Sequence, residues 1–109
     1  MARIFVPNED KAKQYSLEYI EYMRNQPCCI SFENGCDLHH LDNVQVNRKK
    51  PNIRHFTVVP LNRLLHSEYH AIGIDKFQQK YKIQLWREAF YNLAKWVLVK
   101  VEDNERKTT

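Results

Sequence analysis

The sequence predicts an α+β fold in which a short β-hairpin lies among helices. Three observations support this prediction. A helix-forming segment ends at Pro27, a turn signal over residues 33–35 separates two short apolar stretches, and the second half carries three more helical segments. The chain has 109 residues, the length of one domain, so we expect a single domain over residues 1–109.

The first predicted helix covers residues 9–25. Acidic residues stand at its start and an arginine near its end, which suits the helix dipole. Apolar and aromatic side chains recur at helical spacing and would form its buried stripe: Tyr15, Tyr19, Ile20, Tyr22 and Met23. Pro27 ends the helix because it has no backbone N–H with which to continue the hydrogen-bond pattern.

A β-hairpin is predicted next, with strands over residues 28–32 and 36–41. The Asn-Gly pair between them supports the positive φ angles of a tight turn. His39 and His40 would lie on the second strand, where neighbouring side chains point to opposite faces.

The segment over residues 42–55 is polar and basic and contains a proline, so it predicts a loop. For any single cation in this loop, a solvated surface position is the simpler interpretation. As a group, the cations favour contacts with the phosphates of a nucleic acid backbone. With one arginine from the following segment, the candidates are Arg48, Lys49, Lys50, Arg54 and Arg63.

Three helices are predicted in the second half of the chain. Pro60 is a typical helix start and Gly73 a typical stop, so the first helix follows Pro60 and ends before Gly73. A short helix covers residues 74–83 and a longer one residues 85–101, after which residues 102–109 predict a frayed tail. The longer helix has an expected core stripe of Trp86, Phe90, Leu93 and Val97.

Composition limits the classes of partner and compartment. The formal net charge is +4 and the pI about 9.0, a mild basic bias that permits a polyanionic partner without requiring one. No apolar run is long enough to cross a membrane and the N-terminus turns polar at once, so we expect a cytoplasmic protein without a membrane partner. An odd count of 3 cysteines argues against a disulfide framework.

The histidines indicate a metal site. All 5 fall between His39 and His70, and His66 and His70 are four residues apart, so on a helix they share one face. Imidazole nitrogen suits zinc, nickel and other first-row divalent ions. This spacing alone also arises by chance, but His39 or His40 on the preceding strand could complete a site with open coordination positions, as catalytic metals require.

The stretches CDLHHLDN and RHFTVVPLNRLLHSEYHAIG resemble the HNH endonucleases, whose catalytic unit is the ββα-metal (His-Me finger) fold. The likeness is to small phage-type HNH proteins of the YbcO and Ref (recombination enhancement function) kind. These proteins share a paired histidine after a turn, then a Pro-Leu step, then a helix with H-x-x-x-H and a glycine. The resemblance covers about residues 27–81, which leaves the N-terminal and C-terminal helices as scaffold.

The resemblance implies a role for each histidine. His39, His66 and His70 match the metal ligands, and His40 matches the general base that activates water. His55 falls near the middle position of the motif, usually asparagine, which orients the base through a hydrogen bond. Asn52 is the alternative for this position.

The cysteines depart from the family pattern. Many relatives hold a structural zinc ion with two C-x-x-C pairs, which this chain lacks. We therefore expect one divalent metal ion (zinc, nickel, magnesium or manganese) and no second zinc site.

The function that follows is metal-dependent endonucleolytic hydrolysis of DNA phosphodiester bonds. The resemblance places it in phage DNA recombination or processing, in a phage- or prophage-encoded protein. Two alternatives stay open: a non-catalytic nucleic-acid-binding module stabilised by its metal, and a metal-binding protein without a nucleic acid partner. Cutting both strands of a duplex would be easiest for a homodimer, but the residues leave the oligomeric state open.

Overall fold

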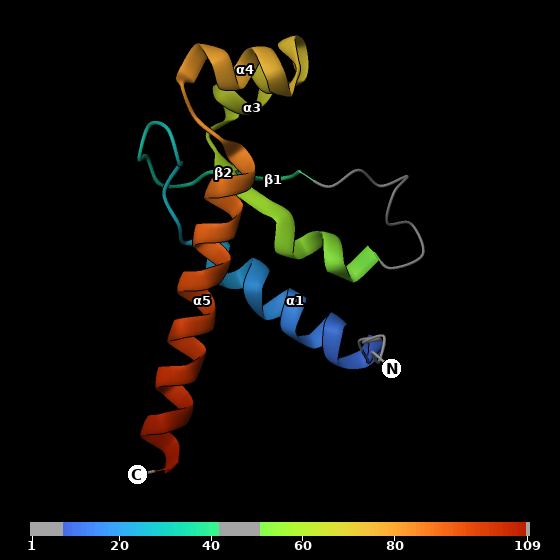
Figure 1. The fold of residues 1–109 in the computed structure, drawn as a ribbon, viewed down its shortest axis with the longest axis vertical. Helices are drawn as coiled ribbons and strands as arrows, with labels where there is room; N and C mark the ends of the chain where they lie inside the picture. Colours follow the sequence, from blue (N-terminus) through green and yellow to red (C-terminus); the bar gives the residue numbers. More distant parts are fainter. Residues whose placement is uncertain (1–7, 42–50, 109) are drawn as a thin grey trace, which may run out of the picture.

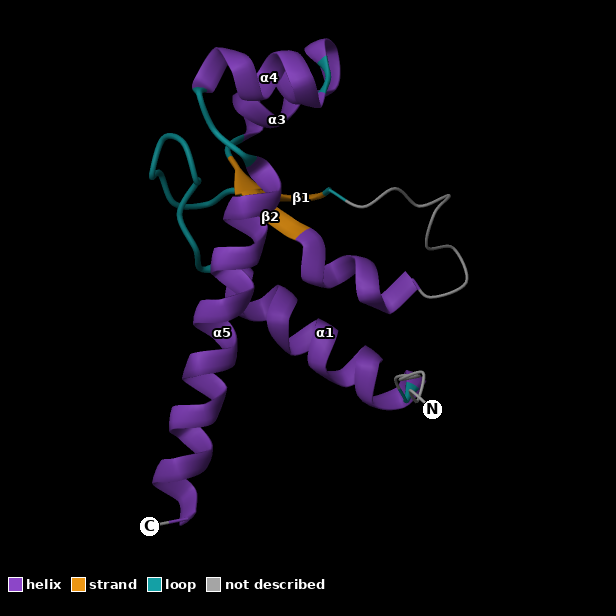
Figure 2. Ribbon diagram, viewed as in Figure 1, coloured by secondary structure: helices purple, strands orange, loops and turns teal. Residues whose placement is uncertain are grey.

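The computed structural model describes residues 8–41 and 51–108 (Figure 1). In chain order, its elements are α1 (Glu9–Arg24), β1 (Asp37–His40), the 3-10 helix η1 (Pro51–Thr57), β2 (Val58–Leu61), α3 (Arg63–Ile72), α4 (Ile74–Tyr81) and α5 (Leu85–Thr108). The predicted α+β class is confirmed, because two short strands cross the centre of the molecule and helices surround them (Figure 2). Among the described helices, none is long and apolar enough to cross a membrane.

The two strands form an antiparallel pair in which Leu38 lies opposite Pro60 and His40 lies opposite Val58. The predicted partner of β1 is therefore wrong: residues 28–32 form a turn, and β2 takes the place of that strand.

Backbone geometry explains why residues 28–32 cannot pair with β1. Phe32 (φ 61°) and Gly35 (φ 75°) both have left-handed conformations, so the chain bends twice before β1 begins. The chain therefore does bend where the Asn-Gly pair predicted a turn, but this turn does not join two strands. One backbone hydrogen bond, from the N–H of Cys29 to the carbonyl of Pro60 (3.0 Å), ties this turn to the outer edge of β2.

The start of α3 also differs from the prediction, because Pro60 lies inside β2. Both strands of a two-stranded sheet are edge strands, where the missing N–H of a proline is tolerated. The helix begins at Arg63 instead, after the N-cap Asn62, whose side-chain oxygen accepts a hydrogen bond from the N–H of Leu65 (2.8 Å). Gly73, with φ 83°, ends α3 as predicted and leads directly into α4.

The core consists of two clusters, one on each side of the strand pair. Around α1, Tyr19, Met23 and Val58 are fully buried, and partly buried Phe56 and Trp96 pack against them. Towards α3 and α4, the buried side chains are Cys28, Val59, Leu61, Leu65, Phe77, Leu85 and Ala89. The pair β1–β2 therefore has helices on both faces, which fixes the orientation of the side chains that alternate along it.

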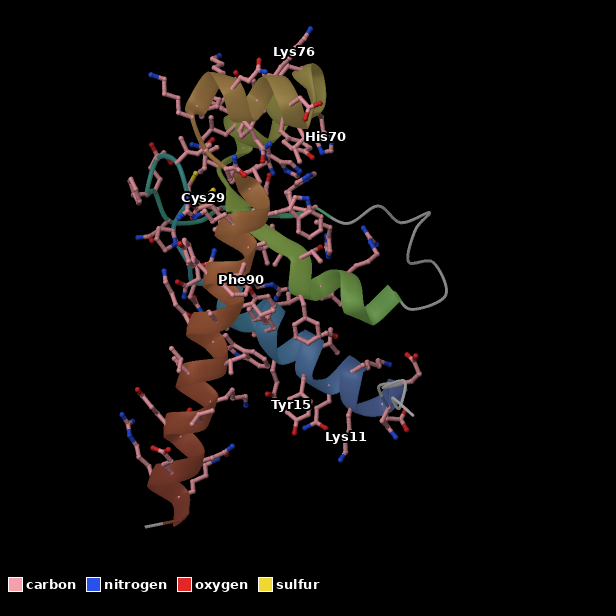
Figure 3. The ribbon with its side chains drawn as sticks, in the orientation of Figure 1. Lys11, Tyr15, Cys29, His70, Lys76 and Phe90 are labelled. Carbon is pink, nitrogen blue, oxygen red and sulfur yellow. The ribbon has the colours of Figure 1, made fainter. Side chains whose placement is uncertain are left out.

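The expected core stripe of α5 is wrong at three of its four positions, whereas Leu93 is partly buried against the α1 cluster as predicted. Trp86 is 51% exposed, Phe90 66% and Val97 46%, whereas Leu85 and Ala89 are buried. The buried face of α5 is thus rotated by about one residue from the predicted one, because Leu85, the first residue of the helix, is buried in the core. Phe90 lies on the exposed side of the helix (Figure 3). The predicted tail is also wrong, since α5 runs on to Thr108.

Candidate active site

Strand β1 divides the histidines into two groups. His39 and His40 are neighbours on the strand, so their side chains leave it on opposite faces. His39 faces α3 and is 8% exposed, whereas His40 faces η1 and α1. The predicted alternation is therefore seen, and each histidine has its own set of partners.

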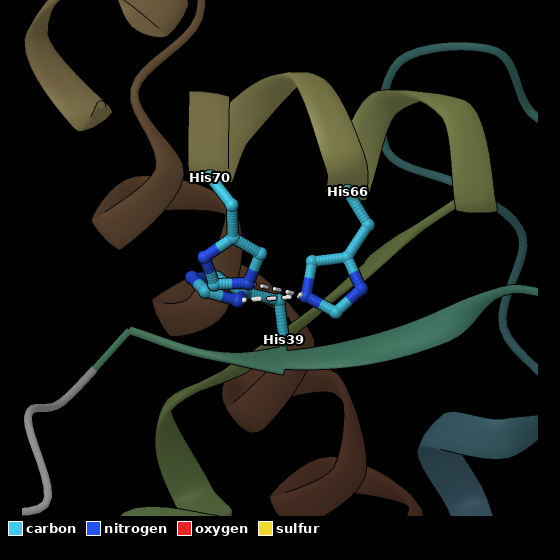
Figure 4. Close-up of side chains that lie close together, drawn as sticks. All are labelled: His39, His66 and His70. Carbon is cyan, nitrogen blue, oxygen red and sulfur yellow. Dashed lines mark hydrogen bonds between the residues drawn. The ribbon is translucent and has the colours of Figure 1, made fainter. Parts of the chain in front are cut away.

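On the first face, three imidazole rings converge between β1 and α3 (Figure 4). His66 and His70 are one helical turn apart and both reach down to β1, where His39 meets them. Nδ1 of His39 lies 3.1 Å from Nε2 of His66, and Nε2 of His70 lies 3.1 Å from the same atom. One nitrogen from each ring lies within 4.8 Å of the others.

Hydrogen bonds alone cannot account for this convergence. A neutral imidazole nitrogen carries either one hydrogen or one lone pair, so it cannot donate to one neighbour while accepting from another. Nε2 of His66 has two nitrogen neighbours at 3.1 Å and cannot form a good hydrogen bond with both. A cation that accepts one lone pair from each ring removes the conflict.

The spacing fits such an ion. In a tetrahedral zinc site, nitrogens about 2.1 Å from the metal lie about 3.4 Å from one another, which is close to the separations in this cluster. Three protein ligands leave coordination positions open for water or substrate, as in catalytic rather than structural metal sites.

Asp37 also belongs to this group of side chains. Its carboxylate oxygen lies 3.4 Å from Nδ1 of His66. A hydrogen on Nδ1 pointing at Asp37 leaves the lone pair of His66 on Nε2, facing the other two rings. The signal in the sequence is alternation: Asp37 and His39 are two residues apart on one strand and therefore share a face.

The environment keeps His39 neutral. Burial, together with smaller effects from the nearby rings of His66 and His70, lowers the pKa of His39 to about 4. The ring of Tyr69 packs against His39 with centroids 4.2 Å apart. Nδ1 of His39 faces the other two rings and is therefore the nitrogen that this ring offers to a ligand, while Nε2 is buried without a hydrogen-bond partner among the described residues.

On the second face, His40 pairs with His55. Nε2 of His40 lies 3.0 Å from Nδ1 of His55. His55 belongs to η1, which therefore places this residue beside β1 although the two histidines are 15 residues apart in the chain. Burial, together with smaller effects from the charge of Arg54 and the ring of His55, lowers the pKa of His40 to about 4. Burial and Arg54 also lower the pKa of His55. Both rings are thus neutral near pH 7, and a cation lies close to both.

The comparisons with known proteins agree with this arrangement. A family model described as "Putative HNHc nuclease" matches residues 7–102. The chain belongs to this HNH nuclease family. The search of curated proteins and the search of solved structures each found no significant match. The HNH match extends beyond residues 27–81 and includes α1 and most of α5, so these helices are part of the family's own region rather than additions to it.

The remaining predicted residues have different positions. Arg63 is exposed in the first turn of α3, one turn before His66. Arg48, Lys49 and Lys50 lie outside the described residues, and so does the side chain of Asn52. The three cysteines are free thiols: Cys28, Cys29 and Cys36.

Proposed function

We propose that the protein is a divalent-metal-dependent endonuclease that hydrolyses phosphodiester bonds in DNA. The observation that carries the proposal is the convergence of His39, His66 and His70 on one point, with His40 adjacent to the first of them on β1. A metal site and a proton acceptor on neighbouring residues of one strand supply the two groups that hydrolysis of a phosphodiester bond requires.

In this proposal, His39, His66 and His70 hold the metal ion. A divalent ion there would stabilise the negative charge that develops on the phosphate and on the leaving 3′ oxygen. The protein contributes a preorganised set of lone pairs, because Asp37 orients His66 and burial keeps His39 unprotonated. Three imidazoles favour zinc or nickel in affinity, while magnesium or manganese could support turnover.

His40 takes the proton of the attacking water in this proposal. Burial holds its pKa at about 4 in the free protein, so the ring is neutral at pH 7 and ready to accept a proton. A phosphate bound nearby would stabilise the imidazolium and raise this pKa towards the working pH. His55 is a positioning residue, because its hydrogen bond fixes which nitrogen of His40 carries the hydrogen.

Cations hold the DNA backbone in this proposal. Arg54 lies close enough to His40 and His55 to lower the pKa of both, so it could contact a phosphate beside them. Arg63 is exposed near the proposed metal site. The proposal also includes phosphate contacts from Arg48, Lys49 and Lys50 and cleavage as a homodimer. It places the protein in phage DNA recombination or processing, like proteins of the YbcO and Ref kind. The setting depends on the sequence resemblance alone.

The test is a plasmid-nicking assay with each of zinc, nickel, magnesium and manganese. The parent protein should nick supercoiled DNA. His40→Ala should bind metal normally but cleave at least about 100-fold more slowly, because it lacks the general base. His66→Ala should lose metal binding in calorimetry, and with it activity. Gln79→Ala, an exposed change on α4, is the control and should behave as the parent.

Two other outcomes would replace the proposal. A parent protein that binds metal and DNA but cuts under no metal would be a non-catalytic binding module. A parent protein that binds no divalent ion would remove the metal centre itself, together with the roles assigned to the three histidines.

A further inference from the structure

A cavity of about 420 Å³ lies on the His40 face of β1, away from the three converging rings. Helix α1 forms one wall with Leu17, Ile20 and Arg24, and β1 forms another with Leu38. The imidazoles of His40 and His55 line it as well. The helix that the HNH resemblance treated as scaffold thus faces the proposed catalytic base across an open cavity.

The lining suits a flat heteroaromatic group. Its aliphatic side chains offer apolar contact, and the two imidazoles offer the stacking faces and hydrogen-bonding edges that proteins use for unstacked bases. The volume of about 420 Å³ falls in the usual range for small-molecule sites, so a nucleobase with part of its sugar fits.

Charge around the cavity suits the phosphates on either side of such a base. Arg24 stands at the end of α1 with its side chain 64% exposed, where it also pairs with Glu21 (2.6 Å). Arg54 lies near both imidazoles, as its effect on their pKa values indicates. A nucleotide in the cavity would therefore have cations near its backbone and apolar walls around its base.

We propose that this cavity is a subsite for one unpaired nucleobase of the DNA substrate, next to the phosphate at His40. The inference depends on the proposed nuclease function and extends it to the substrate class. A base inside a duplex is stacked and paired, so it would have to leave the helix to enter the subsite. Single strands, loops and branched DNA offer such a base freely and are the preferred substrates.

Binding in chelator separates the subsite from catalysis. Fluorescence anisotropy would measure the affinity of the full chain for a short single-stranded oligonucleotide and for the matching duplex. Leu17→Ala removes apolar contact at the mouth of the cavity, where Leu17 is 49% exposed and its loss does not open the core. Leu98→Ala is the matched control, since Leu98 is 63% exposed on α5 and outside the cavity.

Leu17→Ala should weaken single-strand binding about fivefold and duplex binding much less, while Leu98→Ala changes neither. Removing bases from the oligonucleotide one at a time should reveal a position whose loss weakens binding at least about fivefold, as the loss of one stacked base does. At that position Leu17→Ala should have no further effect, because the contact is already gone.

Equal affinities for Leu17→Ala, Leu98→Ala and parent, with no sensitive base position, would overturn the subsite. The nicking assay separates this failure from that of the nuclease. Cleavage without base sensitivity leaves the nuclease and removes the subsite. A sensitive base position without cleavage under any metal leaves a nucleotide-binding cavity and removes the nuclease.

Discussion

The hydrogen bond between His40 and His55 determines which nitrogen of His40 can act as a base. Nε2 of His40 faces Nδ1 of His55 at 3.0 Å, so one of these atoms donates and the other accepts. For His40 to accept a proton from water, Nε2 must carry the hydrogen and donate to His55, which leaves the lone pair on Nδ1. The only requirement on residue 55 is therefore that it offers a hydrogen-bond acceptor to Nε2 of His40.

A substitution at His55 that keeps an acceptor should preserve activity. We expect His55→Asn to retain most of kcat, because an amide oxygen can accept the hydrogen from Nε2 of His40. His55→Ala should lower kcat about 10- to 100-fold, the usual effect of losing a group that orients a metal-site or catalytic histidine. Steady-state cleavage kinetics and calorimetric titration with metal would measure both variants.

The separation of kcat from metal affinity distinguishes positioning from structure. Both variants should bind metal as the parent does, because His55 lies on the other face of β1 from His39. Equal losses of kcat in His55→Asn and His55→Ala would contradict the acceptor role. A loss of metal affinity would indicate that His55 supports the fold rather than the base.

At the scale of the elements, the short segment between β2 and α3 aligns the strand with the helix that carries two of the proposed metal ligands. Asn62 caps α3 by accepting from the N–H of Leu65, and its amide also donates to the hydroxyl of Ser31 (3.2 Å). The first backbone bond of the helix runs from the N–H of His66 to the carbonyl of Asn62 (2.8 Å). One residue therefore sets the helix start and the position of the first proposed ligand on it.

Loss of this cap should destabilise the fold measurably. Asn62→Ala should lower the free energy of unfolding by about 1 kcal/mol, because the N–H of Leu65 loses its partner. Asn62→Asp keeps an accepting oxygen and should recover most of this loss. Urea denaturation of parent and both variants measures the difference. Similar stabilities for all three proteins would show that water satisfies the helix end equally well.

The elements that the sequence predicts well are those with local signals. Helix α1 has an acidic start and a proline beyond its end, and Gly73 stops α3 through a backbone conformation that favours glycine. The strand partner of β1 has no such signal. Residues 28–32 and 58–61 are both short apolar runs, and the choice between them depends on bends at Phe32 and Gly35 that appear only in three dimensions.

The same distinction applies to the candidate site. The four-residue spacing of His66 and His70 and the alternation at His39 and His40 are local, so their faces could be predicted. The approach of Asp37 to His66 depends on how α3 packs over β1, which no spacing encodes. The cavity beside His40 could not be predicted either, because three of its seven lining residues come from α1, a separate element of the chain.

At the scale of the whole molecule, the imidazole rings of His39, His66 and His70 connect two parts of an elongated fold. The radius of gyration is 15.5 Å, against about 13 Å for a compact chain of this length. Helices α3 and α4 form one end, and α1 and α5 lie towards the other (Figure 1). An ion held by His39 and the two α3 histidines would bind β1 to α3, so metal and folding should be coupled.

Without metal, the same histidines should make the fold sensitive to acid. His39 and His40 have pKa values of about 4 in the folded chain, against an ordinary value of 6.5. Below pH 6.5 the unfolded chain therefore binds protons that the folded chain does not bind. The free energy of unfolding falls as the pH falls, and the full loss is reached near pH 4. For His39 alone the loss amounts to about 3 kcal/mol, a large part of the stability of a small domain.

Urea denaturation in chelator at a series of pH values would measure this loss. The free energy of unfolding should fall steadily from pH 6.5 to 4, and His39→Asn should flatten that slope. If this variant does not fold, ring-proton NMR of the folded parent gives the pKa values directly. The hydrogen bond from Lys100 lowers the pKa of Glu18 below its ordinary 4.5, so the loss of that stabilisation begins as the pH falls through about 4.5, at the acid end of this range, and the slope above about pH 5 reports the histidines. A free energy that stays level between pH 6.5 and 4 would mean that the folded chain accepts protons on these rings, and that the faces of β1 are open to water rather than held closed for a metal ion.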